Sequence, residues 1–84
     1  MQKIARSAQD LGHILRQYRY KSEMSQTDLA RRTQTHQRLI SRLETGNKGR
    51  TLDVIFDVMR ALDLEIEIRP RRKGSAQDIE DIFS

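Results

Sequence analysis

The stretch that decides the fold is MSQTDLARRTQTHQRLISRLETG, residues 24–46. Ser25 stands where a helix N-cap belongs, and Asp28 three residues later can complete a capping box. A polar break follows at 33–35, and then a second run with helical spacing ends at Gly46. Glycine is the usual residue just past a helix C-terminus, because it adopts the left-handed backbone there. The stretch therefore predicts two short helices joined by a tight turn.

The second of these helices, expected from about Gln37 to Glu44, has two different faces. Ile40 and Leu43 recur at helical spacing and are expected to point inward. The residues at i, i+3, i+4 and i+7 share the opposite face, and they are Arg38, Ser41, Arg42 and Thr45. A polar, basic outer face on the second helix of such a pair is typical of a helix that enters the major groove of DNA.

This segment resembles the helix-turn-helix of the Cro/C1 (XRE) family, whose pattern is roughly L-S-Q-x-E-L-A-x-x-x-G-V-S-x-x-x-I-S-x-x-E-x-G. The residues that match in identity or close type, without a gap, are Met24, Ser25, Gln26, Asp28, Leu29, Ala30, Ile40, Ser41, Glu44 and Gly46. The chain departs from the pattern where Gln34 replaces a turn glycine, Thr35 an apolar residue and His36 the N-cap serine. A non-glycine residue in a left-handed turn costs roughly 1 kcal/mol, which weakens the turn without changing the spacing.

Two further helices are expected on either side of this motif. Ser7 can cap the first, which ends near Lys21 and carries an apolar stripe of Leu11, Ile14, Leu15 and Tyr18. Thr51 can cap the last, which follows a polar loop at 46–50. Its inward face is expected to consist of Leu52, Ile55, Phe56, Met59 and Leu62.

Residues 64–69, LEIEIR, change the period from 3.6 to 2 and predict a half-buried strand that Pro70 ends. One strand alone is not stable, and nothing else in the sequence resembles a partner. We therefore expect a second copy of the chain to supply an antiparallel strand across a two-fold axis, with Leu64, Ile66 and Ile68 facing the helices at the dimer interface. An extended tail packed on its own domain is the alternative.

The expected fold is mainly α: a four-helix, lambda-repressor-like helix-turn-helix domain at 1–70 with one C-terminal β-strand that pairs across a homodimer. This plan is similar to that of the HipB antitoxins over residues 3 to about 70. The resemblance implies a homodimer that binds and represses the operator DNA of its own toxin–antitoxin operon, and that also binds a HipA-like kinase toxin. It also implies that Glu44 makes a structural ion pair or cap.

The net charge of +4 conceals a division between the two halves of the chain. Residues 1–50 hold 11 Lys and Arg against 4 Asp and Glu, whereas residues 51–84 hold 5 against 8. The basic half carries the helix-turn-helix, as expected when one face meets phosphates and the other meets protein. Charge runs are also common on plain solvated surfaces, and Arg31 and Arg32 fit either description.

The DNA-contacting residues are expected at the start of both motif helices and just after the second. Gln37 can pair with adenine and Arg38 with guanine, whereas Arg42 is expected to hold a phosphate. His36 is expected either near a base or merely as a cap. The expected set is Gln26, Thr27, His36, Gln37, Arg38, Ser41, Arg42, Asn47 and Lys48.

Residues 71–84 have linker composition followed by an acidic end. Ile79, Ile82 and Phe83 lie at i, i+3 and i+4 there, so a short helix could form against a partner, the toxin in the antitoxin interpretation. Without a partner, this tail is expected to be disordered.

Catalysis, cofactors and metals find no support in the sequence. There is no cysteine, the two histidines are scattered, and no glycine-rich phosphate loop or nucleophile motif occurs. No apolar run reaches transmembrane length and no signal peptide is visible, so we expect no membrane partner and a place on the nucleoid in a bacterial cytoplasm. Two alternatives to the antitoxin stay open: a stand-alone regulator, such as a phage repressor or restriction controller, and a protein-interaction module that has lost DNA binding.

Overall fold

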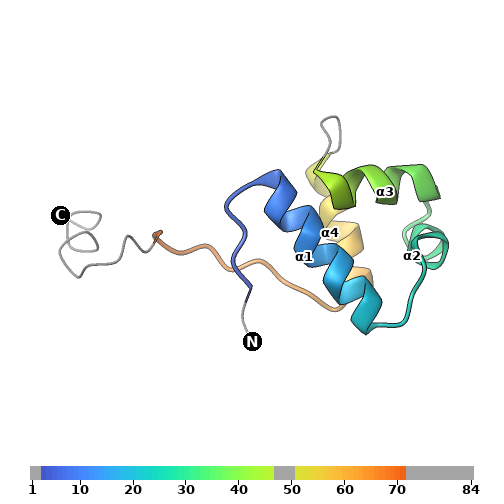
Figure 1. Cartoon of the computed structure of the whole chain (residues 1–84), viewed down its shortest axis with the longest axis horizontal. Coiled ribbons are helices and arrows are strands. Elements are labelled where there is room, and N and C mark those ends of the chain that lie inside the picture. The colour runs from blue at the N-terminus through green and yellow to red at the C-terminus, as the bar shows by residue number, and fades with distance from the viewer. Residues whose placement is uncertain (1–2, 47–50, 72–84) are drawn as a thin grey trace.

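The computed structural model describes residues 3–46 and 51–71, and these residues contain four helices (Figure 1). The helices are α1 (Ala8–Lys21), α2 (Gln26–Arg32), α3 (Gln37–Thr45) and α4 (Leu52–Ala61). Figure 1 shows α3 along one edge of the bundle, with α2 beside its beginning and α1 crossing in front of α4. The predicted mainly α fold with four helices is confirmed.

Capping side chains define where the helices begin. Ser7 Oγ accepts from the Asp10 N–H at 3.0 Å, and Thr51 Oγ1 accepts from the Val54 N–H at 3.4 Å. Ser25 and Asp28 form the reciprocal capping box, with both hydrogen bonds at 3.0 Å. These bonds satisfy backbone N–H groups that have no partner in a first helical turn. The predicted starts of α1, α2 and α4 are therefore confirmed.

The core lies between the helices and is built from aliphatic side chains. α3 packs against α1 and α2, and α2 also contacts α4. Ile40 and Leu43 of α3 are 0% and 1% exposed, as the spacing predicted. The buried core consists of Leu15, Leu29, Ala30, Ile40, Leu43, Ile55, Val58, Met59 and Leu62. α3 thus buries one face and is held firmly by its neighbours.

The predicted inward face of α4 was wrong at two positions. Leu52 and Phe56 are 68% and 47% exposed, whereas Val58, which the predicted stripe omitted, is fully buried. α4 carries apolar residues around more than one side, so helical periodicity alone could not select the side that packs. The consequence is an uncovered apolar surface on the last helix.

Residues 64–71 continue from α4 as an extended segment that passes the lead at 3–6 (Figure 1). Leu64 donates its N–H to the Met59 carbonyl at 2.8 Å and packs partly against the core. Ile66 and Ile68 are 45% and 93% exposed. The described residues contain no β-strand, because a strand needs a ladder of hydrogen bonds with a neighbour and the single chain supplies none. Of the three residues predicted to face the helices, only Leu64 does so within one chain, and pairing with a second copy stays a prediction.

Candidate nucleic-acid interface

The turn between α2 and α3 has a left-handed residue where the sequence lacks the usual glycine. Gln34 has φ 56°. The Thr33 hydroxyl donates to the Leu29 carbonyl at 2.9 Å, which leaves its oxygen to accept from the Thr35 hydroxyl at 2.9 Å. The Thr35 N–H donates to the Ala30 carbonyl at 2.9 Å. The left-handed backbone at a non-glycine residue weakens this turn, and the hydrogen bonds of the two hydroxyls stabilise it.

His36 caps α3. Its Nδ1 accepts from the Leu39 N–H at 3.2 Å, which requires that Nδ1 carry no proton. The imidazole replaces the hydroxyl that a serine would offer and satisfies one unpaired N–H of the first turn. Gly46, with φ 78°, ends the same helix in the left-handed conformation predicted for it.

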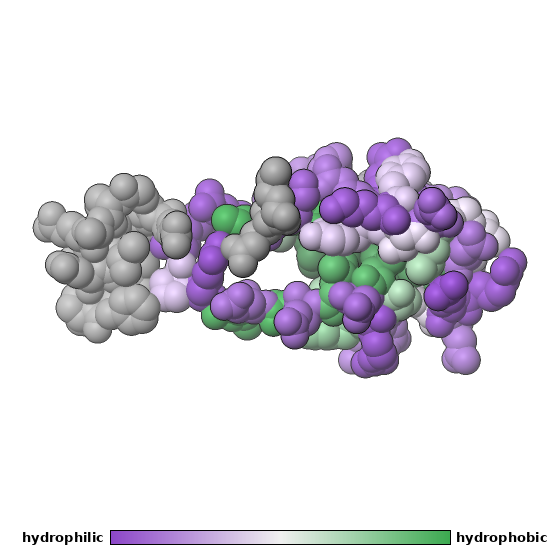
Figure 2. Space-filling view, turned by 90° about the horizontal axis from the view of Figure 1, so that it is seen from below, coloured by the Kyte–Doolittle hydropathy of each residue, from purple (hydrophilic) through white to green (hydrophobic). Residues whose placement is uncertain are grey.

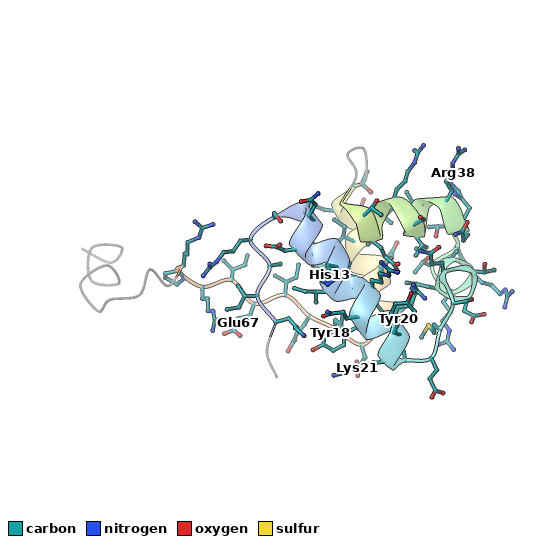
Figure 3. The ribbon with its side chains drawn as sticks, viewed as in Figure 1. His13, Tyr18, Tyr20, Lys21, Arg38 and Glu67 are labelled. Carbon is teal, nitrogen blue, oxygen red and sulfur yellow. The ribbon has the colours of Figure 1, made fainter. Side chains whose placement is uncertain are left out.

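The outer side of α3 carries the basic residues that the sequence placed there. Arg38 and Arg42 are exposed and Ser41 is half-buried. Figure 3 shows the Arg38 side chain extending from α3 away from the other helices. Neither guanidinium lies within salt-bridge distance of a carboxylate among the described residues. Both charges are therefore available to an anionic partner such as a phosphate.

A buried ion pair joins α1 to the end of α3. Arg19 Nε donates to Glu44 Oε2 at 2.6 Å and Arg19 Nη2 donates to Glu44 Oε1 at 3.1 Å. The two side chains are only 6% and 2% exposed. Arg19 Nη1 also donates to the Met24 carbonyl at 2.8 Å, just before α2. The hydrogen bonds that Arg19 donates to the Glu44 carboxylate hold the pKa of Arg19 above its ordinary value despite its burial. The structural ion pair expected for Glu44 is present, and the sequence had not indicated its partner.

Two glutamines connect this ion pair to the surface. Gln26 Nε2 donates to Glu44 Oε1 at 3.1 Å. Gln37 Nε2 in turn donates to Gln26 Oε1. We call Glu44, Gln26 and Gln37 the glutamine relay. The sequence did not indicate it, because Gln26 lies on α2 whereas Gln37 and Glu44 lie on α3.

The predicted DNA-contacting residues are partly brought together. The structure places Gln26 against Gln37 and aligns Arg38, Ser41 and Arg42 along α3, with His36 at its start. Thr27 is exposed in the first turn of α2. The remaining two of that set, Asn47 and Lys48, lie outside the described residues, as does the partner anchor predicted at Ile79, Ile82 and Phe83.

No cluster of three or more His, Asp or Glu side chains suited to a metal ion occurs in the described residues. Their helices are also too short or too polar for any of them to cross a lipid bilayer.

The geometry agrees with comparisons to known proteins. A family model described as a helix-turn-helix domain matches residues 10–71. The restriction-modification controller protein C.AhdI from Aeromonas hydrophila is 28% identical with a TM-score of 0.64, over 69% of this chain and 84% of that chain. A chain of the HipA-HipB-O2-O3 complex is 25% identical with a TM-score of 0.74, over 86% of this chain and 100% of that chain. The chain in a HipB-O4 20mer complex gives 25% identity and a TM-score of 0.75, with 86% and 100% covered. No curated protein sequence matches the chain.

Proposed function

The chain belongs to the helix-turn-helix family, of the XRE type, and from that premise we propose that it is an antitoxin that represses its own toxin–antitoxin operon as a dimer. The same protein would bind a HipA-like kinase toxin, as HipB is found with HipA in the complex that it resembles. Such a regulator acts where the DNA is, on the nucleoid in the bacterial cytoplasm. The protein is proposed to work by binding alone, without a cofactor or a catalytic step.

The observation that carries this proposal is the outer face of α3. Arg38 and Arg42 are exposed there, whereas Ile40 and Leu43 on the opposite face are only 0% and 1% exposed. A helix held from behind by the core, with a basic outer side, can enter a major groove without rearrangement. We propose that bases and phosphates are contacted by the set predicted from the sequence: Gln26, Thr27, His36, Gln37, Arg38, Ser41, Arg42, Asn47 and Lys48.

Uncovered apolar side chains support the proposed homodimer. Leu52 and Phe56 project from α4 at i and i+4, and Ile66 and Ile68 are exposed along the extended segment. Figure 2 shows hydrophobic surface uncovered in the middle of one face, with hydrophilic side chains around it. Each such side chain stabilises an interface by roughly 1.5–3 kcal/mol when buried. A second copy that pairs at residues 64–69 would cover Ile66 and Ile68 and complete the strand.

Similarity to the controller protein supports a second candidate function. C.AhdI has the higher identity of the two kinds of neighbour, 28% against 25%. A stand-alone regulator would share the proposed DNA contacts but need no toxin. The fuller coverage of HipB favours the antitoxin, because 86% of this chain is matched there against 69% for C.AhdI.

Co-purification separates the two candidates. The full chain would be co-expressed with the product of the neighbouring reading frame, and the isolated material tested for binding to the DNA upstream of the pair. The antitoxin proposal predicts a stable complex with a kinase-like protein that still retards the upstream DNA. Retardation of that DNA by the chain alone, with no partner retained, would support the stand-alone regulator instead.

A truncated variant tests the toxin contact within the antitoxin proposal. We propose that Ile79, Ile82 and Phe83 form a short anchor for the partner protein. Truncation after Lys73 should then weaken the toxin complex and leave the affinity for the upstream DNA unchanged. Full toxin binding by the truncated chain, or loss of its DNA binding, would contradict the anchor.

A further inference from the structure

We propose that residues 65–71 carry a self-complementary sequence of charges, which fixes how two copies of the chain pair and restricts pairing to strands that carry the same sequence. The proposal deepens the homodimer proposed above and rests on it, because it names the residues that select the partner strand. The pairing is antiparallel and centred on Ile68, so that Ile68 of one copy lies opposite the partner's Ile68.

The extended segment after α4 has an apolar side and a charged side, because side chains alternate along extended backbone. Figure 3 shows Glu67 on this segment, apart from the four helices. The charges run as two acids followed by two bases, which is complementary to the same sequence read in reverse. An antiparallel partner presents the sequence in reverse. The apolar positions are Leu64, Ile66, Ile68 and Pro70, and the charged positions are Glu65, Glu67, Arg69 and Arg71.

The bonding capacity of this segment is unused within one chain. No backbone N–H or carbonyl of residues 65–71 bonds to the backbone of the described residues. None of its four charged side chains lies within salt-bridge distance of an opposite charge in 3–46 or 51–71. Ile66 and Ile68 are 45% and 93% exposed. The segment therefore offers an open strand edge, unpaired charges and uncovered apolar side chains, and one added strand would satisfy all three.

The apolar side limits the registers that two such strands can adopt. Residues directly opposite each other in an antiparallel pair point to the same face of the sheet. A pairing centred between two residues would set each isoleucine opposite an acid, a base or another charged position. It would thus divide the isoleucines between the two faces of the sheet. Only pairings centred on a residue keep the apolar and charged faces separate.

Like charges exclude most of the registers that remain. A pairing centred on Ile66 would place each Glu65 opposite the partner's Glu67. A pairing centred on Glu67 or on Arg69 would place that side chain opposite its own copy. Like charges directly opposite each other destabilise a strand pair. These three registers are therefore disfavoured.

The register centred on Ile68 makes every cross-strand charge pair attractive. Each Glu67 lies opposite the partner's Arg69, and each Glu65 lies opposite the partner's Arg71. Opposite charges in such positions stabilise the pair of strands. A strand with another order of charges would meet at least one like charge in this register. The four charges therefore select a second copy of the same chain.

Pro70 fits the same register. It lies opposite the partner's Ile66, two positions from the central pair of Ile68 residues. Opposite residues alternate between pairs that exchange two hydrogen bonds and pairs that exchange none. Because proline has no N–H, the pairs at Pro70 and Ile68 are of the second kind, and the pairs of Glu67 with Arg69 carry the bonds. The ladder thus passes Pro70 without losing a hydrogen bond.

The test is sedimentation equilibrium of the full chain, which measures the dissociation constant of the dimer. Four proteins are compared: wild type, Glu67→Arg, Arg69→Glu, and Glu23→Arg as a matched control. Glu23 is an exposed acid outside the segment, so its replacement changes the net charge by the same amount as Glu67→Arg. Circular dichroism establishes that each protein is folded.

The expected result depends on which copies are mixed. Glu67→Arg and Arg69→Glu should each raise the dissociation constant of their own dimer by about tenfold or more, because two attractive pairs become repulsive. Glu23→Arg should stay within about twofold of wild type. A mixture of Glu67→Arg with Arg69→Glu has attractive pairs at every position. Its heterodimer should therefore form about as tightly as the wild-type homodimer.

Failure of the register and failure of the proposed homodimer give different results. If Glu67→Arg dimerises as tightly as wild type or more tightly, the register is wrong and the homodimer stands. The same conclusion follows if the mixture forms no heterodimer, or if Glu23→Arg weakens the dimer as much as Glu67→Arg does. If wild type is a monomer, the homodimer in the proposed function is itself wrong.

A cross-linking measurement keeps the proposal testable if a charge variant does not fold. The chain has no cysteine, so one introduced thiol can form a disulfide only between two copies. The register centred on Ile68 places the two Cα atoms of residue 68 about 4.5 Å apart, within reach of a disulfide. The two residues at 66 lie about 13 Å apart along the strands. With oxidised glutathione, Ile68→Cys should form a disulfide-linked dimer much faster than Ile66→Cys, and an equal or slower rate would overturn the register.

Discussion

Gly12 of α1 lies directly against the backbone carbonyl of Leu43 in α3. A Cβ atom at position 12 would be 2.3 Å from the Leu43 oxygen and 2.8 Å from the Glu44 oxygen. Only a residue without a side chain allows this approach. The contact sets how deeply α1 packs against α3, about two helical turns before Arg19 reaches Glu44.

Gly12→Ala should therefore destabilise the fold, although alanine favours a helix over glycine. The obstructing atoms are backbone, so α1 and α3 must separate, and overpacking of this kind costs roughly 1–3 kcal/mol. His13→Ala, at the next and exposed position, is the control and should change the free energy of unfolding by less than about 0.5 kcal/mol. Urea unfolding of both variants measures the difference. An unchanged or raised stability for Gly12→Ala would contradict the close approach.

Removing Arg19 should have a larger effect than removing any exposed arginine. Arg19→Met leaves the Glu44 carboxylate buried without its cation, which costs about 3–5 kcal/mol. Arg60→Met serves as the control, because Arg60 pairs with Asp57 at 3.3 Å with side chains 78% and 46% exposed. Such a surface pair contributes about 0–1 kcal/mol. If both variants lose the same free energy of unfolding in chemical denaturation, the buried Arg19–Glu44 pair stabilises the fold no more than a surface pair does.

Gln34→Gly should stabilise the turn between the two motif helices. Gln34 has φ 56°, which glycine adopts without strain. The free energy of unfolding is expected to rise by about 0.5–1 kcal/mol. This value is the relief of backbone strain less the cost of the greater freedom of glycine in the unfolded chain. Arg32→Gly, at the last residue of α2, should instead destabilise by up to about 1 kcal/mol. Thermal unfolding of the two variants measures these opposite changes in stability. A change in the same direction for both would show that Gln34 is not strained.

The capping box of α2 predicts a loss of stability in acid. The Asp28 carboxylate accepts the Ser25 N–H, and this bond holds the pKa of Asp28 below its ordinary value. The stabilisation is present above the unfolded pKa of about 3.9 and is lost as the pH falls through the lower folded value. Asp28→Asn should therefore be less stable than wild type at neutral pH, and the difference should shrink below pH ~4. Melting curves from neutral to acid pH test this, and a constant difference would exclude the carboxylate as its source.

Base and phosphate contacts should respond differently to substitution. Arg38→Ala is expected to cost roughly 1–3 kcal/mol on the operator and to relax specificity at one position in each half-site. Lys48→Ala should weaken all sequences alike and lower the salt slope of binding by about 1. Titrations on operator and random DNA at several salt concentrations separate the two. Identical behaviour on both DNAs would show that the residues were assigned to the wrong partners.

Local patterns were sufficient to predict most of the fold. Ser7, Ser25 and Thr51 were predicted as caps from their position before apolar periodicity, and each caps a helix. The motif spacing placed α3 within one residue of its observed end at Thr45. These features depend on neighbours within four residues, which is the range over which helix sequence signals act.

Features that depend on contacts between elements could not be predicted in this way. Leu52 and Phe56 were assigned to the core because they share a stripe with Met59, but α4 has apolar residues on several sides and packing selects another. The bond between Gln26 and Gln37 joins two helices, and no local pattern reveals that these side chains meet. The strand predicted at 64–69 would need a second chain to pair with, and residues 64–69 form no strand in the single chain.

Footprinting of the full chain on the DNA upstream of its own gene tests the central claim most directly. A two-fold dimer with two α3 helices predicts protection of an inverted repeat, with half-site centres about one helical turn apart, or a multiple of it. Protection should be symmetric, and it should weaken as the salt concentration is raised. Binding by the basic residues of the helix-turn-helix half releases counterions from the phosphates, and added salt opposes that release. A single asymmetric half-site at saturation, or no sequence-selective protection at all, would contradict the account.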